Sequence, residues 1–169
     1  MTTRFTVFAL LFAALSAPTA GAETPIKKAE RDDIFMVPTA DPAMERAFGK
    51  ARSTLDNFLR MASSPAPGTS DYSVKVAVTD GKNTEYFWVR DFERKGEKFA
   101  GTLANEPRMV KKFKNGQRFD FSRNLIVDWT YIDASKRKTF GNFTACALLT
   151  REPPQEARKF REQFGLDCD

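Results

Sequence analysis

The chain has 169 residues, 41% of them hydrophobic and 12% aromatic, and a net charge of +5. This length suits one domain with a substantial core and is short for two. Histidine is absent, which excludes Ser-His-Asp and Cys-His catalysis and removes the commonest transition-metal ligand. With two cysteines and no glycine-rich phosphate loop, the sequence predicts no metal site and no cofactor.

The first 22 residues have the organisation of a secretory signal peptide. Arg4 gives a positive start, Phe5 to Ala17 an apolar run, and residues 20–22 are small, as signal peptidase requires. The apolar run is too short to span a bilayer. We therefore expect cleavage between Ala22 and Glu23, no transmembrane anchor, and a chain that works outside the cytoplasm. There its positive charge suits an anionic envelope polymer or a protein partner, and not nucleic acid.

Cys146 and Cys168 both follow the expected cleavage site. In an oxidising compartment such a pair favours one disulfide. The alternative is a redox or nucleophilic cysteine, but there is no Cys-x-x-Cys spacing to support it. We expect the bridge to tie the C-terminal tail to the last strand of the domain.

Residues 23–40 are polar with little periodicity and are expected to form a flexible lead-in to a single domain over residues 41–169. The domain begins with a predicted helix, because Asp41 is a good N-cap and Pro42 suits the first helical position. Apolar residues then recur at spacings of three and four until residues 63–68 end the helix. This buried stripe comprises Met44, Ala47, Phe48, Ala51, Leu55, Phe58 and Leu59.

Beyond residue 71 the apolar period changes to two, which predicts strands. Residues 72–79 and 84–92 form a predicted hairpin around Asp80-Gly81. The second strand has aromatic residues on both of its faces, which favours a strand covered on both sides. A third strand is expected over residues 98–103, a short helical turn over residues 109–113, and a hairpin made by residues 117–121 and 125–132. A last strand is expected near residues 142–149, followed by a helix that Pro153-Pro154 opens and Gly165 caps, with Ala157, Phe160 and Phe164 facing inward.

Consecutive strands flanked by terminal helices predict an α+β fold. We expect an antiparallel sheet of about five or six strands, packed against an N-terminal helix and a short C-terminal helix.

Glu85 and Asp128 are the candidate acid or base residues, since each lies in an aromatic strand where a carboxylate can acquire a raised pKa. The alternative is structural: each is hydrogen-bonded to backbone or paired with a basic group such as Lys75. Trp88 and Trp129 either line a ligand groove or belong to the core. The basic runs 111–114 and 136–138 are either solvated loops or contacts for acidic polymers.

Several short motifs occur in an order that resembles the YegJ-like family, domain of unknown function 2314. The resemblance spans residues 41–149 and implies a small bacterial domain, often exported and hence periplasmic, with no established activity. It singles out five polar residues for a shared site, namely Lys75, Glu85, Asn105, Asp128 and Asn142. The motifs that carry it are Ala51-Arg52, Val74-Lys75-Val76, Glu85-Tyr86-Phe87-Trp88, Phe99-Ala100-Gly101, Asn105-Glu106-Pro107, Gly116-Gln117, Ile126-Val127-Asp128-Trp129 and Gly141-Asn142-Phe143-Thr144.

Three functions are compatible with these observations. The first is a non-catalytic binding module for an envelope component or a protein partner. The second is a hydrolase or lyase that uses Glu85 and Asp128, and this requires both carboxylates to converge on one cleft. The third is an immunity or inhibitor protein. The oligomeric state stays open.

Overall fold

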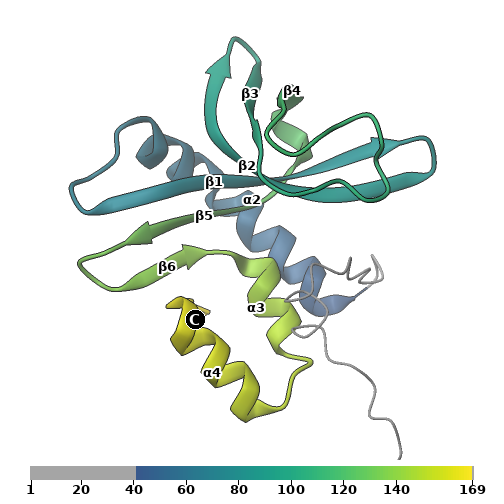
Figure 1. The fold of residues 1–169 in the computed structure, drawn as a ribbon. Helices are drawn as coiled ribbons and strands as arrows, with labels where there is room; N and C mark the ends of the chain where they lie inside the picture. The colour runs from purple at the N-terminus through teal and green to yellow at the C-terminus, as the bar shows by residue number, and fades with distance from the viewer. Residues whose placement is uncertain (1–40, 169) are drawn as a thin grey trace, which may run out of the picture.

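The computed structural model describes residues 41–168, so the expected signal peptide, the cleavage site at Ala22 and Glu23 and the segment 23–40 lie outside the described residues. A six-stranded antiparallel sheet forms the centre, with strand order β4-β3-β2-β1-β5-β6 (Figure 1). The predicted α+β class is therefore confirmed. The elements are α2 (Pro42–Ser63), β1 (Thr69–Asp80), β2 (Asn83–Lys95), β3 (Lys98–Leu103), β4 (Arg118–Ser122), the 3-10 turn η1 (Arg123–Leu125), β5 (Ile126–Asp133), β6 (Lys138–Gly141), α3 (Phe143–Leu149) and α4 (Pro154–Phe164).

Helix α2 begins where the local signals place it. The Asp41 side chain accepts a hydrogen bond from the backbone amide of Met44 at 2.9 Å, and Pro42 occupies the first turn. The apolar stripe of the helix is buried, and fully buried Phe58 stacks on Trp129 of β5 with ring centroids 4.8 Å apart. Aromatic packing therefore fixes α2 on the sheet.

Strand β2 bends in its second half. Asp91 has a φ of 49°, and the pairing between β2 and β3 shifts register between Arg90 and Glu93, as in a β-bulge. Figure 1 shows β3 and β4 turned away from the part of the sheet that contains β5 and β6. Gly101 permits this bend, because a Cβ atom there would lie 2.5 Å from Cγ1 of Val89.

Two sequence-based expectations about strands are wrong. Strand β2 is not covered on both faces. Tyr86 is 41% exposed on one face, whereas its neighbours Glu85 and Phe87 are buried on the other. The expected hairpin of residues 117–121 and 125–132 is also absent, since β4 pairs with β3 and β5 pairs with β1. Both segments do form strands. Their partners are chosen by core packing, such as that of Phe99 on Phe121, which no local period encodes.

The segment expected as a last strand at residues 142–149 is instead helix α3. Strand β6 ends at Gly141, with a φ of 76°, and Asn142, with a φ of 51°, turns the chain into the helix. The backbone amides of the first two residues of α3, Phe143 and Thr144, donate hydrogen bonds to the carboxylate of Asp128 in β5. A helix can therefore form there although the side chain of its N-cap residue, Asn142, makes no capping hydrogen bond.

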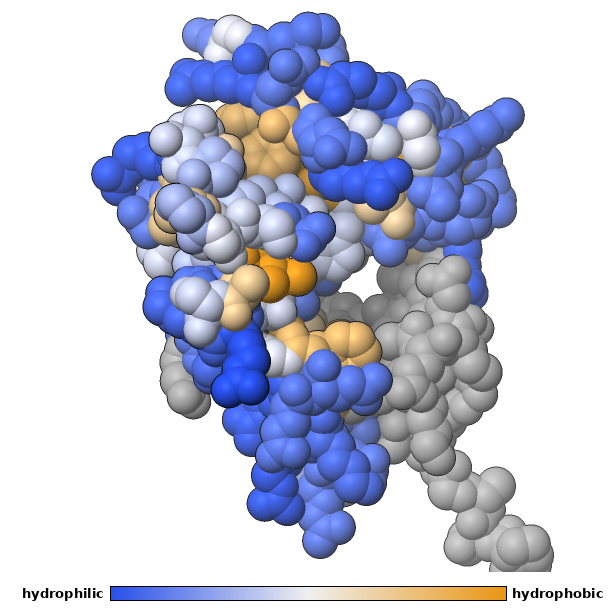
Figure 2. Space-filling model, turned by 60° about the vertical axis from the view of Figure 1, so that its left-hand side comes forward, coloured by the Kyte–Doolittle hydropathy of each residue, from blue (hydrophilic) through white to orange (hydrophobic). Residues whose placement is uncertain are grey.

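The other C-terminal expectations are met in part. Residues 109–113 form turns and no helix. Helix α4 forms and Gly165 caps it with a φ of 60°, as predicted, but its apolar face is not buried, and Phe164 is 49% exposed. Figure 2 shows the α4 end of the molecule, at the bottom, as almost entirely hydrophilic on this face, whereas apolar residues gather nearer the middle.

The predicted disulfide between Cys146 and Cys168 is present, with Cα atoms 5.5 Å apart. It ties the tail to α3, however, and not to a strand. The tail also extends the sheet, because Thr139 donates its amide to the Gly165 carbonyl at 2.7 Å and accepts from the Asp167 amide at 3.0 Å. A parallel bridge pairs Thr139 with Leu166, so the tail covers part of the β6 edge.

Candidate functional site

Three of the predicted site residues form a row across three strands. Lys75 of β1 lies opposite Trp88 of β2 on one side and Asp128 of β5 on the other. Side chains directly opposite each other in an antiparallel ladder lie on the same face and contact one another. The ammonium nitrogen of Lys75 is 4.6 Å from the centroid of the Trp88 ring, which is a cation–π contact.

Thr144 of α3 completes this group and connects Lys75 to Asp128. Its hydroxyl accepts a hydrogen bond from Lys75 Nζ at 2.7 Å and donates one to Asp128 Oδ2 at 2.6 Å. We call Lys75, Trp88, Asp128 and Thr144 the lysine cluster. Sequence reasoning missed Thr144, because a threonine in a segment expected to be a strand carries no signal for this contact.

Asp128 is fully buried, and the backbone uses its carboxylate. It accepts hydrogen bonds from the amides of Trp129 at 2.8 Å, Phe143 at 3.2 Å and Thr144 at 2.8 Å, in addition to the Thr144 hydroxyl. A carboxylate has about four acceptor positions, so these four donors occupy it. Asp128 thus serves as the N-terminal cap of α3.

The surroundings of Lys75 shift its pKa. Burial lowers the pKa of Lys75, and the charge of Asp128 opposes that effect in part. The environment is consistent with this direction, since an aromatic ring and one hydroxyl replace most of the water that an ammonium group prefers.

Glu85 lies on the opposite face of the sheet, where it pairs with Val78. It is 6% exposed and accepts backbone hydrogen bonds from Arg108 at 3.0 Å, Met109 at 3.0 Å and Val110 at 3.1 Å. Asn105 acts nearby on the same loop, accepting a hydrogen bond from the Trp88 amide at 2.7 Å. Glu85 and Asn105 therefore anchor the loop of residues 104–116 against β2.

The remaining candidates have structural positions. Trp129 packs in the core, and its indole nitrogen donates to the Ala51 carbonyl at 3.2 Å and to the Thr54 hydroxyl at 3.1 Å. Asn142 makes the turn into α3. Because Glu85 and Asp128 lie on opposite faces, the convergent carboxylate pair that the hydrolase or lyase hypothesis requires is not formed.

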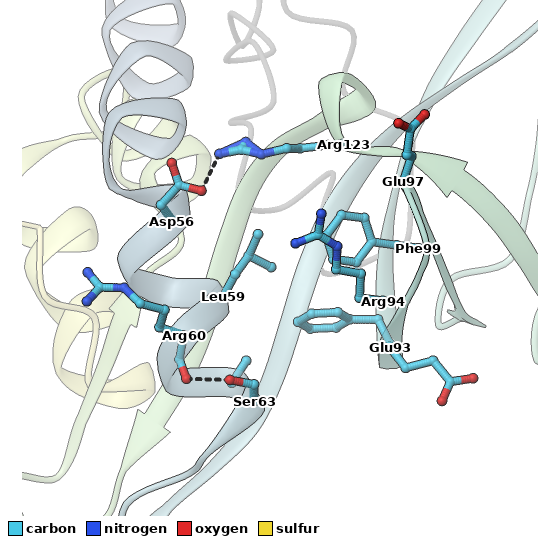
Figure 3. Close-up of a pocket in the computed structure, with 11 residues that line it drawn as sticks. Asp56, Leu59, Arg60, Ser63, Glu93, Arg94, Glu97, Phe99 and Arg123 are labelled. Atoms are coloured by element: carbon cyan, nitrogen blue, oxygen red, sulfur yellow. Dashed lines mark hydrogen bonds and ion pairs between the residues drawn. The ribbon is translucent and has the colours of Figure 1, made fainter.

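A groove lies between the second half of α2 and the bent part of β2 and β3 (Figure 3). Its volume is about 680 Å³, and Leu59, Phe92 and Phe99 provide apolar lining. Figure 3 shows Arg94 and Arg123 pointing from the sheet side toward α2, with Phe99 beside Arg94. We call this the α2–β3 groove. No sequence pattern indicated it, since its lining comes from three separate segments of the chain.

Other kinds of site find no support in the part of the chain that the structure describes. Between residues 41 and 168 there is no group of three cysteine, aspartate or glutamate side chains arranged to hold a metal ion. None of the helices in this range has the length and apolarity needed to cross a membrane.

Comparison with known proteins places the chain in a family. Residues 41–168 match the model of "Uncharacterized protein conserved in bacteria (DUF2314)". The chain is also similar to "Uncharacterized protein YegJ" of Escherichia coli (strain K12), with 31% identity over 122 residues that cover 72% of this chain and 77% of the relative. No solved structure matches the chain. The chain belongs to the DUF2314 family of bacterial proteins, whose molecular function is unknown.

Proposed function

We propose that this protein is an exported, non-catalytic binding module for an anionic component of the bacterial envelope. One observation carries the proposal: backbone amides occupy both candidate carboxylates, Glu85 and Asp128, whereas the α2–β3 groove presents apolar surface together with three arginines and three other carboxylates. The buried polar groups thus hold the fold together, and the open surface is suited to binding.

Two further features support the proposed compartment. The first 22 residues have the pattern of a signal peptide. The Cys146–Cys168 disulfide suits an oxidising environment, where such bridges form and persist. Removal of residues 1–22, which include Arg4, lowers the net charge from +5 to +4, and this charge favours association with acidic polymers and lipid head groups.

The export step is tested with the full chain produced in a Gram-negative bacterial host. We expect the protein in the osmotic-shock fraction, with a mass that corresponds to a chain beginning at Glu23 and with no alkylated cysteine. A matched chain lacking residues 2–22 is the control and should stay in the cytosol. If the full chain stays in the cytosol with its leader uncut, the proposed compartment is wrong.

The binding step is tested by co-sedimentation with vesicles. The mature protein should sediment with vesicles containing phosphatidylglycerol more than with vesicles of phosphatidylcholine alone. Added salt should release it, because exposed charges are screened over about 10 Å at 0.1 M ionic strength. Equal sedimentation with both kinds of vesicle would contradict an anionic target.

A further inference from the structure

We infer that the α2–β3 groove binds a single-chain anionic amphiphile of the fatty-acid type, with its hydrocarbon chain on Leu59, Phe92 and Phe99 and its acidic head at Arg94. This inference rests on the proposed binding function and names the ligand class of one site. Figure 3 shows the arrangement that supports it, an apolar wall with guanidinium groups beside it.

The apolar part of the groove suits a hydrocarbon chain. Phe92 and Phe99 contact each other edge to face, with centroids 6.4 Å apart, and Leu59 lies across from them on α2. These side chains line one continuous space of about 680 Å³. Sites for small ligands have volumes of about 300–1,000 Å³ and mostly apolar walls with a few placed polar groups.

The charged side chains that line the groove are balanced, with Arg60, Arg94 and Arg123 against Asp56, Glu93 and Glu97, so the case for an anionic head rests on Arg94. Arg94 donates through Nε to the Gly96 carbonyl at 2.9 Å, and within residues 41–168 no carboxylate pairs with its guanidinium. Of these carboxylates, Asp56 pairs with Arg123 and Glu93 pairs with Arg118, each at 2.6 Å. Figure 3 shows the carboxylates of Glu93 and Glu97 pointing away from the apolar side chains.

Arg123 offers a second contact at little cost. It pairs with Asp56 at 2.6 Å, but the Asp56 side chain is 83% exposed. Exposed ion pairs contribute little net free energy, so Asp56 competes only weakly with a carboxylate head for Arg123, provided that the Asp56 side chain turns into solvent. The guanidinium group also matches a carboxylate in shape, which allows two parallel hydrogen bonds.

Isothermal titration calorimetry of the mature protein with dodecanoate tests this site. Dodecyltrimethylammonium has a chain of similar length and a cationic head, and acetate has the same head without the chain. We expect dodecanoate to bind with one ligand per protein and neither control to bind. Arg94→Gln should weaken binding about tenfold, equivalent to about 1.4 kcal/mol, and Leu59→Gln should also weaken it.

Arg158→Gln is the matched control, since Arg158 is exposed on α4 outside the groove, and it should leave the affinity unchanged. The inference is overturned if dodecanoate does not bind below about 1 mM, if the cationic amphiphile binds equally well, or if Arg94→Gln and Leu59→Gln have no effect. Each of these results leaves the vesicle and export experiments unaffected, so failure of this site and failure of the proposed function are distinguishable.

Discussion

At the scale of single residues, Asp128 provides from a strand the capping hydrogen bonds that the side chain of Asn142, the N-cap residue of α3, does not make. Replacing it with asparagine removes the charge beside Lys75 and turns an acceptor oxygen into a donor that faces buried amides. Breaking a buried, hydrogen-bonded charge in this way costs about 3–5 kcal/mol. We therefore expect Asp128→Asn to lower the free energy of unfolding by about 3 kcal/mol or more.

Urea denaturation followed by circular dichroism measures this change. Asp120→Asn is the matched control, because Asp120 is exposed on β4 and such surface substitutions stay within about 0.5 kcal/mol. If both variants unfold at the same urea concentration, the cap assigned to Asp128 does not stabilise the fold.

Lys75 gives a second prediction, about alkaline pH. Burial lowers the pKa of Lys75 in the folded chain below the usual value of 10.5. At pH values between the lowered pKa and 10.5, Lys75 is therefore protonated in the unfolded chain and deprotonated in the folded chain. The free energy of unfolding should therefore gain a contribution from Lys75 as pH rises through that interval. Lys75→Met should remove this contribution.

The measurement is urea denaturation at a series of alkaline pH values. The series stays below 10.0, the usual pKa of tyrosine, because burial raises the pKa of Tyr131 and its titration would add a second pH dependence above that value. Lys98→Met, at an exposed position of β3, is the control and should keep the pH dependence of the wild type. An identical pH dependence in both variants would mean that the pKa of Lys75 is not lowered.

The sequence predicts that polar residues in aromatic strands need partners, and it does not identify those partners. Lys75 and Asp128 do meet, as one structural alternative proposed, but through Thr144. Glu85 meets three backbone amides from a loop more than twenty residues away. Such contacts depend on which strands become neighbours, and a backbone amide carries no sequence signature.

At the scale of elements, helices α2 and α3 differ in where their start signals lie. The cap of α2 is Asp41, directly before the helix, so a local pattern finds it. The cap of α3 is Asp128, fifteen residues before Phe143 in the chain. The seven residues of α3 are too few to distinguish a helix from a strand by their own pattern. The tertiary contact decides between the two.

The turn between β5 and β6 gives a prediction for acid pH. Hydrogen bonds from Lys136 and Ser135 lower the pKa of Asp133 to about 2, from a usual value of 3.8. The stability that Asp133 contributes is therefore complete above the usual value and is lost as pH falls through about 2. We expect Asp133→Asn to be less stable than the wild type at neutral pH and to lose less stability on acidification.

Thermal unfolding at a series of pH values between neutrality and about 2 measures both effects. Asp120→Asn again serves as the control, because the carboxyl group that it removes is exposed on β4 and lies outside any turn. A parallel loss of stability in the wild type and in Asp133→Asn would show that this turn does not depend on the ionised carboxylate.

At the scale of the whole molecule, the disulfide holds the C-terminal arm, which consists of α4 and residues 165–168, against the domain. No residue of α4 is buried, and Leu166, which follows the helix, is the buried apolar residue of this arm, so the helix itself adds little packing. The bridge joins residues 22 positions apart, and closing a loop of that size is worth about 3 kcal/mol in the chain-entropy model. We expect the double variant Cys146→Ala, Cys168→Ala to lose about this much stability.

Hydrogen exchange locates the effect. The amides of Thr139 and Asp167, which join the tail to β6, should lose more protection in the double variant than amides in β1, which exchange through global unfolding. The wild type with its disulfide intact is the reference. If tail and β1 amides change together, the arm is part of the cooperative core and is not held mainly by the bridge.

Composition and periodicity were enough to predict the fold class, the first helix and the disulfide of this protein. They could not reveal the α2–β3 groove, because Leu59, Phe92 and Arg123 belong to segments that only the bend of β2 and the path from β4 to β5 bring together. Binding surfaces made by distant segments lie beyond what local patterns encode.

The tail that pairs with β6 also limits how copies of this protein can associate. Within residues 41–168 the backbone amide and carbonyl of Thr139 are already used, so a strand of another copy cannot pair with β6 at this position. The tail therefore protects this part of the sheet edge from edge-to-edge addition.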